Sequence, residues 1–169
     1  NALGVRLTQI PMTPARVLGA NERIKMDIVP RICRGEVCFA IGMSEPNSGS
    51  DLFAAKTKAT KTDGGWLING TKIWTTSAHM ADYMLAIFRT SPPTKENRRH
   101  GLTQFLVDMK TPGITIRPIV NMADVHSFNQ VFFDNVRVPK SNMVGVKNRG
   151  WYTAATLLDF ERSGVGRAS

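Results

Sequence analysis

Short apolar runs separated by turn residues fill the middle of this chain, and they constrain its fold more than any other sequence feature. The turns between them are rich in Gly, Pro and Asn, which break strands for identifiable steric reasons. The runs are residues 38–41, 66–68, 72–76, 83–88, 102–107, 114–116 and 131–133. Many short strands at this spacing are typical of a sandwich or barrel, so we predict a mainly β chain with an antiparallel β-barrel or sandwich-like domain.

Two of the turns carry strong hairpin signals. Asp63-Gly64-Gly65 and Asn69-Gly70 favour positive φ, which Gly and Asn tolerate better than other residues. We therefore expect Asn69-Gly70 to join two antiparallel strands. Pro112-Gly113 and Pro139 punctuate the later runs.

Both ends of the chain have helical rather than β periodicity. Residues 14–35 have the pattern of a broken amphipathic helix, with Pro30 near a helix start or turn. The C-terminal apolar face consists of Trp151, Ala154, Ala155, Leu158 and Phe160. The order predicts a helical segment over 1–36, a β-domain over 37–147 and a second helical segment over 148–169, which together make an α+β chain.

The charge of the chain is strongly basic. It has 22 Lys and Arg against 13 Asp and Glu, a formal net charge of +9, and such a balance often serves a polyanionic partner. Much of the excess lies in residues 89–100, which lack the interleaved aromatic residues that stack on bases. A solvated loop accounts for this stretch, and a nucleotide cofactor or coenzyme A would account for the other cations. A basic β-barrel that binds nucleic acid is the alternative from another class.

Composition argues against several other kinds of protein. Cys33 and Cys38 are too few for a disulfide framework and lack zinc spacing, and the 3 histidines are scattered singly. No stretch approaches the roughly 18 unbroken apolar residues of a membrane span, so we expect a soluble protein without a metal site. The chain begins at Asn1, stops at Ser169 within a helical pattern and shows no leader peptide, so we expect both ends to be cut from a longer chain.

Two polar stretches are candidates for ligand binding. Residues 43–51 end a β-like run with a sharp turn that exposes amides and hydroxyls, and Gly49 would let a ligand approach the backbone closely. In residues 69–77, period-two alternation places Trp74 and Thr76 on one face of a strand, which sets a flat indole beside a hydroxyl. Taken singly, the first pattern also occurs in ordinary loops and the second in β-sheet cores.

Together and in this order, the two stretches resemble the acyl-CoA dehydrogenase family, whose middle domain carries a Glu-Pro-x-x-Gly-Ser-Asp turn and a Gly-x-Lys-x-Trp-x-Thr strand. Both patterns are complete here, at residues 45–51 and 70–76. The likeness extends to residues 132–139 and 157–162 and covers essentially the whole chain. It implies the end of an N-terminal helical domain, a middle β-domain and the start of a C-terminal helical domain.

The resemblance implies a flavoprotein oxidoreductase of fatty acid metabolism that binds FAD and dehydrogenates an acyl-CoA thioester. A carboxylate removes the α-proton while hydride leaves the β-carbon for flavin N5. By family match, the residues that bind the flavin are Ile41, Met43, Ser44, Gly49, Ser50, Trp74, Thr75 and Thr76. Ser44 would bond the ring edge, Trp74 would pack on the isoalloxazine, and Thr76 would donate toward N5, where a preorganised donor lowers the cost of accepting hydride.

The resemblance places the catalytic base either at Glu161 or beyond the end of the chain. Most family members carry this glutamate late in the C-terminal bundle, and a minority carry it on the first helix of the bundle, at the position of Glu161. Ser50, Asp159 and Arg162 match positions that contact the acyl-CoA. Asp159 and Arg162 could equally form ion pairs on a helix face, and Glu161 could be a surface carboxylate.

Several related activities fit the same residues. An acyl-CoA oxidase or a flavin monooxygenase would share the flavin motifs, and a non-catalytic subunit would share the fold. For the dehydrogenase, the resemblance implies electron-transferring flavoprotein as electron acceptor, a homo-oligomer at full length, and neither nucleic acid nor a membrane span. The compartment would be the cytoplasm in a bacterium or the mitochondrial matrix in a eukaryote.

Overall fold

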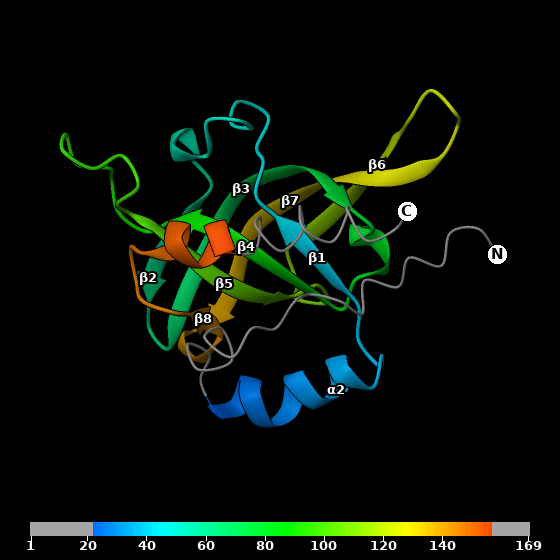
Figure 1. Ribbon diagram of the computed structural model, residues 1–169, viewed down its shortest axis with the longest axis horizontal. Coiled ribbons are helices and arrows are strands. Elements are labelled where there is room, and N and C mark those ends of the chain that lie inside the picture. Colours follow the sequence, from blue (N-terminus) through cyan, green and yellow to red (C-terminus); the bar gives the residue numbers. More distant parts are fainter. Residues whose placement is uncertain (1–21, 157–169) are drawn as a thin grey trace.

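The computed structural model describes residues 22–156, and strands dominate this part of the chain (Figure 1). The strands are β1 (Phe39–Gly42), β2 (Lys58–Thr62), β3 (Gly65–Thr76), β4 (Tyr83–Arg89), β5 (Leu102–Asp108), β6 (Ile114–Val120), β7 (His126–Pro139) and β8 (Met143–Val144). The short helical elements are η1 (Ile24–Ile28), α2 (Val29–Cys33), η2 (Leu52–Ala54), η3 (Ala78–Met80) and η4 (Lys140–Asn142). Residues 150–156 are also helical. Mainly β structure flanked by helices confirms the predicted fold class.

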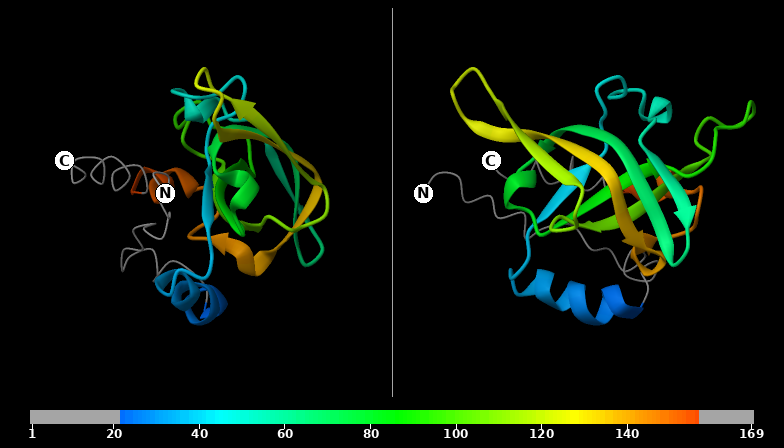
Figure 2. Two further views of the ribbon diagram at one scale, coloured as in Figure 1. Left: turned by 90° about the vertical axis from the view of Figure 1, so that its right-hand side faces the viewer. Right: turned by 180° about the vertical axis from the view of Figure 1, so that it is seen from behind.

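The strands form one strongly curved sheet (Figure 2). Its order is β6-β7-β3-β2-β4-β5-β8, and β1 pairs with β4 beside this path. Most neighbours are antiparallel, whereas β1 runs parallel to β4, and β2 meets β4 in parallel only through Lys58 and Arg89. The two end strands, β6 and β8, do not pair with each other, so the sheet has the curvature of a barrel without closing into one.

The prediction that Asn69-Gly70 joins two strands is wrong. The hairpin between β2 and β3 turns at residues 63–64, and Asn69-Gly70 lies inside β3, where the register with β7 shifts between Ile68 and Gly70. Gly70 has a φ of +138°, and a Cβ there would lie 2.8 Å from Thr57. The positive φ that favours a hairpin turn is used instead for a bulge that lets the strand pass close to Thr57.

The core is divided between the two faces of the sheet, because alternate residues of β4 and β5 point in opposite directions. One face buries an aromatic cluster that includes Trp66, Phe88, Phe105 and Phe133, with ring centroids 5.4–6.0 Å apart. The other face is covered by helical residues, and its cluster includes Ile24, Ile28, Ile32, Ile87, Leu102, Leu106 and Ala154. Full burial of one such side chain contributes about 1.5–3 kcal/mol.

The helical expectations hold within the described residues. Ile24, Ile28 and Ile32 form the buried face of η1 and α2, and Pro30 lies in the first turn of α2, directly after the π-helical η1. Trp151 and Ala154 lie in the helical residues after Gly150, and Trp151 packs edge-on against Phe53 at a centroid distance of 4.7 Å. Ala155 is partly buried in the same helical residues, whereas Leu158 and Phe160 lie outside 22–156. Within that range, no helix has the length and apolarity needed to cross a bilayer.

Candidate cofactor site

The C-terminal end of β3 exposes a large aromatic side chain. Trp74 is 59% exposed, whereas Thr75 next to it is 1% exposed and Thr76 is again exposed. Trp74 and Thr76 therefore face the same way, as alternation predicted, although the strand is irregular here. Trp74 has a φ of +60°, and the register with β7 shifts between Lys72 and Thr75. A bulky residue with left-handed backbone at a bulge is costly, and such residues gather at functional sites.

Thr75 faces the interior, so it presents only its backbone toward the Trp74 side. Its Oγ1 atom is buried and has no hydrogen-bond partner among the described residues. Its carbonyl accepts a hydrogen bond from Nδ2 of Asn129 at 3.0 Å. The same amide contacts Nδ1 of His79 at 3.2 Å and Nε2 of His126 at 2.7 Å. Asn129, which is fully buried, thereby fixes the backbone that carries Thr76.

The Ser44 segment lies beside this end of β3. The backbone N–H of Ile73 donates to the carbonyl of Ser44 at 2.9 Å, directly before Trp74 in the chain. The segment reaches this position through β1, where a Cβ on Gly42 would lie 2.6 Å from Sδ of Met84. The fold thus brings together the two motifs that the sequence places far apart.

The turn after Ser44 is closed by its own hydrogen bonds. Glu45 and Ser48 exchange two backbone hydrogen bonds of 2.7 and 3.0 Å, and the Ser48 hydroxyl donates to the carbonyl of Asp51 at 2.9 Å. Ser48 is therefore occupied within the turn, while Gly49 and Ser50 are exposed. A Cβ on Gly49 would meet nothing within 4 Å, so packing among residues 22–156 does not require glycine there.

Ile41 and Met43 have a different environment from Ser44. Met43 is 7% exposed, Ile41 is partly buried, and both pack in the apolar cluster on the helix-covered face of the sheet. Of the predicted flavin contacts, Ile41 and Ser44 are partly exposed, and Gly49, Ser50, Trp74 and Thr76 are exposed.

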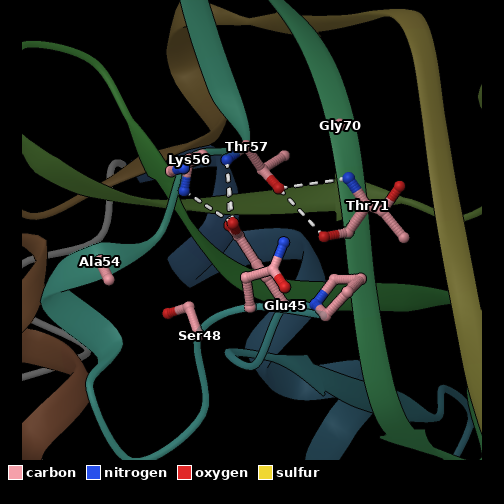
Figure 3. A pocket seen from close by; sticks show the side chains of 9 residues that line it. Glu45, Ser48, Ala54, Lys56, Thr57, Gly70 and Thr71 are labelled. Atoms are coloured by element: carbon pink, nitrogen blue, oxygen red, sulfur yellow. Dashed lines mark hydrogen bonds between the residues drawn. The ribbon is translucent and has the colours of Figure 1, made fainter.

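A buried ion pair anchors the turn to β3. Nζ of Lys72 lies 2.9 Å from Oε1 of Glu45, and their side chains are 0% and 7% exposed. Lys72 also donates to the carbonyl of Met43 at 3.0 Å. The Glu45 carboxylate accepts the backbone N–H groups of Lys56 and Thr57 at 2.6 and 3.0 Å (Figure 3).

Burial and the attraction between the two charges act in opposite directions on the pKa values of Glu45 and Lys72. Burial by itself raises the pKa of Glu45, but the Lys72 charge and the hydrogen bonds from Lys56, Lys72 and Thr57 outweigh it, so the pKa lies below the ordinary value. Burial lowers the pKa of Lys72, and attraction to Glu45 opposes that effect. Sequence reasoning assigned no role to Glu45, Lys72 or Asn129. Glu45 and Lys72 are, however, the Glu and the Lys of the two family patterns, and this membership is the sequence feature that could have indicated a role.

Figure 3 looks into the small pocket beside this pair, with a volume of about 240 Å³. The turn forms one wall, and Ala54, Lys56, Thr57, Gly70 and Thr71 form the rest. The Thr57 hydroxyl bridges the backbone of Thr71, donating to its carbonyl at 3.1 Å and accepting from its N–H at 3.2 Å (Figure 3). The segment before β2 is therefore tied to both the turn and β3.

The basic loop forms internal contacts at both ends. Arg89 donates to three backbone carbonyls at 2.6–3.1 Å, those of Phe53, Ala55 and His100. Arg98 pairs with Asp51 at 2.6 Å. These two cations hold the segment after the turn against the loop, which explains part of the positive charge without a polyanionic partner.

The predicted substrate-side residues Asp159, Glu161 and Arg162 lie outside the described residues, as does the motif at 157–162. Within 22–156, no group of three or more His, Cys, Asp or Glu side chains is arranged to hold a metal ion. The described part of the candidate site is therefore made of the turn and the end of β3.

Comparisons with known proteins agree on one family. The sequence profile of the acyl-CoA dehydrogenase middle domain matches residues 40–136. Acyl-CoA dehydrogenase FadE34 of Mycobacterium tuberculosis is 46% identical over 85% of this chain and 20% of its own length. An acyl-CoA dehydrogenase of Bacillus subtilis is 33% identical over 97% of this chain and 44% of its own length.

Solved structures give the same result. The Tcur3481-Tcur3483 steroid ACAD superposes with a TM-score of 0.84 at 31% identity, covering 93% of this chain and 40% of that one. The glutaryl-coenzyme A dehydrogenase glutaryl-CoA complex gives a TM-score of 0.82 at 28% identity, covering 94% and 40%. A curved β-domain with an exposed aromatic platform thus corresponds to the middle domain of a multidomain enzyme class. The chain belongs to the acyl-CoA dehydrogenase family, and it spans less than half the length of these relatives.

Proposed function

We propose that this chain is the flavin-binding part of an FAD-dependent enzyme that dehydrogenates an acyl-CoA thioester between its α and β carbons. The observation that carries the proposal is the 2.9 Å hydrogen bond from Ile73 to Ser44, which joins the two motifs. It sets a half-buried serine beside an exposed indole and an exposed threonine. A flat ring with polar edges suits this combination of an aromatic face and hydroxyl donors.

The residues present fit FAD. Trp74 would pack its exposed face on the ring and keep water from that side, while Ser44 and Thr76 would supply hydroxyl groups at the ring edge. Gly49 leaves room for close approach, and Ser50 stands at the exposed end of the turn. The chemistry that bound FAD supplies is acceptance of hydride from the β-carbon. Thr76 would donate a hydrogen bond toward the ring position that accepts hydride, where negative charge develops.

The proton-abstracting base is proposed to be Glu161, at a position that the family pattern gives to the base in a minority of members. Asp159, Arg162 and Ser50 are proposed to contact the acyl-CoA. The domain division at 36–37 and 147–148, the homo-oligomer at full length and electron-transferring flavoprotein as acceptor belong to the same proposal. Support for it is the family membership and the match of these positions to the family pattern.

The test is anaerobic bleaching of the flavin absorbance in the full-length polypeptide that contains these residues, with a panel of acyl-CoAs. Wild type should bleach with at least one of them, and Glu161→Gln should keep bound flavin without bleaching. Glu96→Gln in the exposed basic loop is the matched control and should bleach like wild type. Equal bleaching of Glu161→Gln and wild type would move the base beyond Ser169. Failure of the wild-type protein to bind flavin would overturn the proposed function.

An oxidase is the second candidate, because the prolyl acyl carrier protein oxidase AnaB superposes with a TM-score of 0.78 at 26% identity. The two activities differ in how reduced flavin meets oxygen. Substrate-dependent oxygen consumption with hydrogen peroxide release would favour the oxidase. Turnover that requires electron-transferring flavoprotein would favour the dehydrogenase.

A further inference from the structure

We propose that Glu45 and Lys72 are positioning residues, whose buried ion pair sets the Met43–Ser48 turn against β3 and thereby fixes the polar edge of the flavin site before FAD binds. This inference rests on the proposed function, since it concerns the same site. It adds a role for two buried side chains to which the sequence analysis assigned none.

The ion pair connects three parts of the chain: β3, the turn and the segment just before β2. Lys72 comes from β3, and its ammonium has two acceptors, the Glu45 carboxylate at 2.9 Å and the Met43 carbonyl at 3.0 Å. Glu45 comes from the turn, and its carboxylate also accepts the N–H groups of Lys56 and Thr57, just before β2. The carbonyl of Met43 directly precedes Ser44, so its hydrogen bond with Lys72 restrains the backbone that carries the proposed ring-edge contact.

The position of Lys72 on β3 connects the ion pair to the end of β3 that carries Trp74. The next residue, Ile73, holds the Ser44 carbonyl, and Trp74 follows with its positive φ. Two successive residues of β3, Lys72 and Ile73, thus donate hydrogen bonds to the successive carbonyls of Met43 and Ser44. Nζ of Lys72 also lies 5.5 Å from the centroid of the Phe88 ring, which restricts the ammonium further.

The chemistry of the pair favours positioning over simple stabilisation. Removing two charges from water offsets much of their mutual attraction, and apolar side chains of similar volume often stabilise a fold equally well. Apolar side chains, however, could not bond the Met43 carbonyl or the amides of Lys56 and Thr57. A directional pair at this point defines one arrangement of the turn, and preorganisation of this kind raises ligand affinity.

The test compares Glu45→Gln, Lys72→Met and the double variant with wild type in the full-length polypeptide. FAD affinity of the deflavinated proteins and the visible spectrum of bound flavin are measured at temperatures where circular dichroism shows each protein folded. We expect each single variant to raise the Kd for FAD at least tenfold and to shift the flavin absorption band. The double variant should regain thermal stability without regaining FAD affinity. Glu36→Gln, which breaks an exposed contact with Arg34, should change neither quantity.

A merely structural role gives a different result: the melting temperature falls, while the Kd and spectrum of the folded variants stay as in wild type. That outcome overturns the inference and leaves the proposed function intact. If wild type itself binds no FAD, the proposed function fails instead. Hydrogen exchange in wild type tests the idea without any variant. The amides of Lys56 and Thr57 should be protected equally with and without FAD, and free exchange in the deflavinated protein would overturn it.

Discussion

Two ion pairs hold the two ends of the same turn, and they differ in burial far more than in length. The Glu45–Lys72 pair has side chains 7% and 0% exposed at 2.9 Å, whereas the Asp51–Arg98 pair has side chains 50% and 64% exposed at 2.6 Å. The shorter Asp51–Arg98 pair is the weaker, because water and salt screen its charges and both side chains are well solvated when they are apart. Burial rather than distance therefore decides which contact the fold depends on.

The largest effect should come from leaving one buried charge without its partner. Lys72→Met keeps much of the side-chain volume but strands the Glu45 carboxylate, so we expect the free energy of unfolding to fall by about 3–5 kcal/mol. Urea titration followed by circular dichroism measures it. Adding Glu45→Gln to Lys72→Met should restore a substantial part, since the double variant buries no unpaired charge. A loss under about 1 kcal/mol in Lys72→Met would show that the pair is not buried as described.

Acid should weaken the same contact. Because the folded-state pKa of Glu45 lies below its ordinary value of 4.5, its contribution to stability is complete above pH 4.5 and is lost as the pH falls through the lower folded value. The difference in unfolding free energy between wild type and Glu45→Gln should therefore shrink on going from pH 7 to below that folded value. Urea titrations of both proteins across this range measure it. A difference that stays constant would contradict ionisation of Glu45 in the fold.

A second comparison, between two tryptophans of β3, separates function from stability. Trp66 is 6% exposed in the core, and Trp74 is 59% exposed with a φ of +60°. Trp66→Ala should cost about 3–5 kcal/mol of unfolding free energy. Trp74→Gly should change it by less than about 1 kcal/mol, because glycine relieves the left-handed backbone while the Phe128 contact is lost.

FAD binding, unlike stability, should depend strongly on Trp74. In the full-length polypeptide, Trp74→Gly should raise the Kd for FAD at least tenfold, which corresponds to about 1.4 kcal/mol. Fluorescence quenching of FAD on binding measures the Kd. An unchanged Kd would remove Trp74 from the flavin site. A large loss of stability in Trp74→Gly would instead make the exposed indole a structural element.

The fold class could be predicted from sequence because its signals are local. Gly, Pro and Asn separate the strands, and the isoleucines of residues 24–32 mark a helical face. The Asn69-Gly70 prediction failed because a positive φ serves a hairpin or a bulge equally, and the choice depends on Thr57 arriving from another segment. A fully buried lysine such as Lys72 was also beyond pattern reasoning, since lysine on a strand is ordinarily assigned to the surface.

The candidate site was predictable by resemblance but not by geometry. Ser44, Trp74 and Thr76 follow from the two motifs, whereas the Ile73–Ser44 hydrogen bond that joins the motifs depends on the tertiary fold. Asn129 left no signal at all, because it lies beside Gln130 and before the apolar run 131–133, where polar residues usually face solvent. Its full burial under Thr75 becomes apparent only when β3 and β7 pair.

The smallest effect should come from the exposed end of the turn. Asp51→Asn removes the charge that pairs with Arg98 but keeps the backbone carbonyl that accepts the Ser48 hydroxyl. We expect the free energy of unfolding to fall by less than about 0.5 kcal/mol at low salt and to match wild type in about 1 M salt. Urea titration at both salt concentrations measures it. A loss of unfolding free energy as large as that of Lys72→Met, or one that persists in high salt, would mean that a part of the protein beyond residues 22–156 shields Asp51 from water. Both ends of the turn would then be stabilised by desolvated ion pairs.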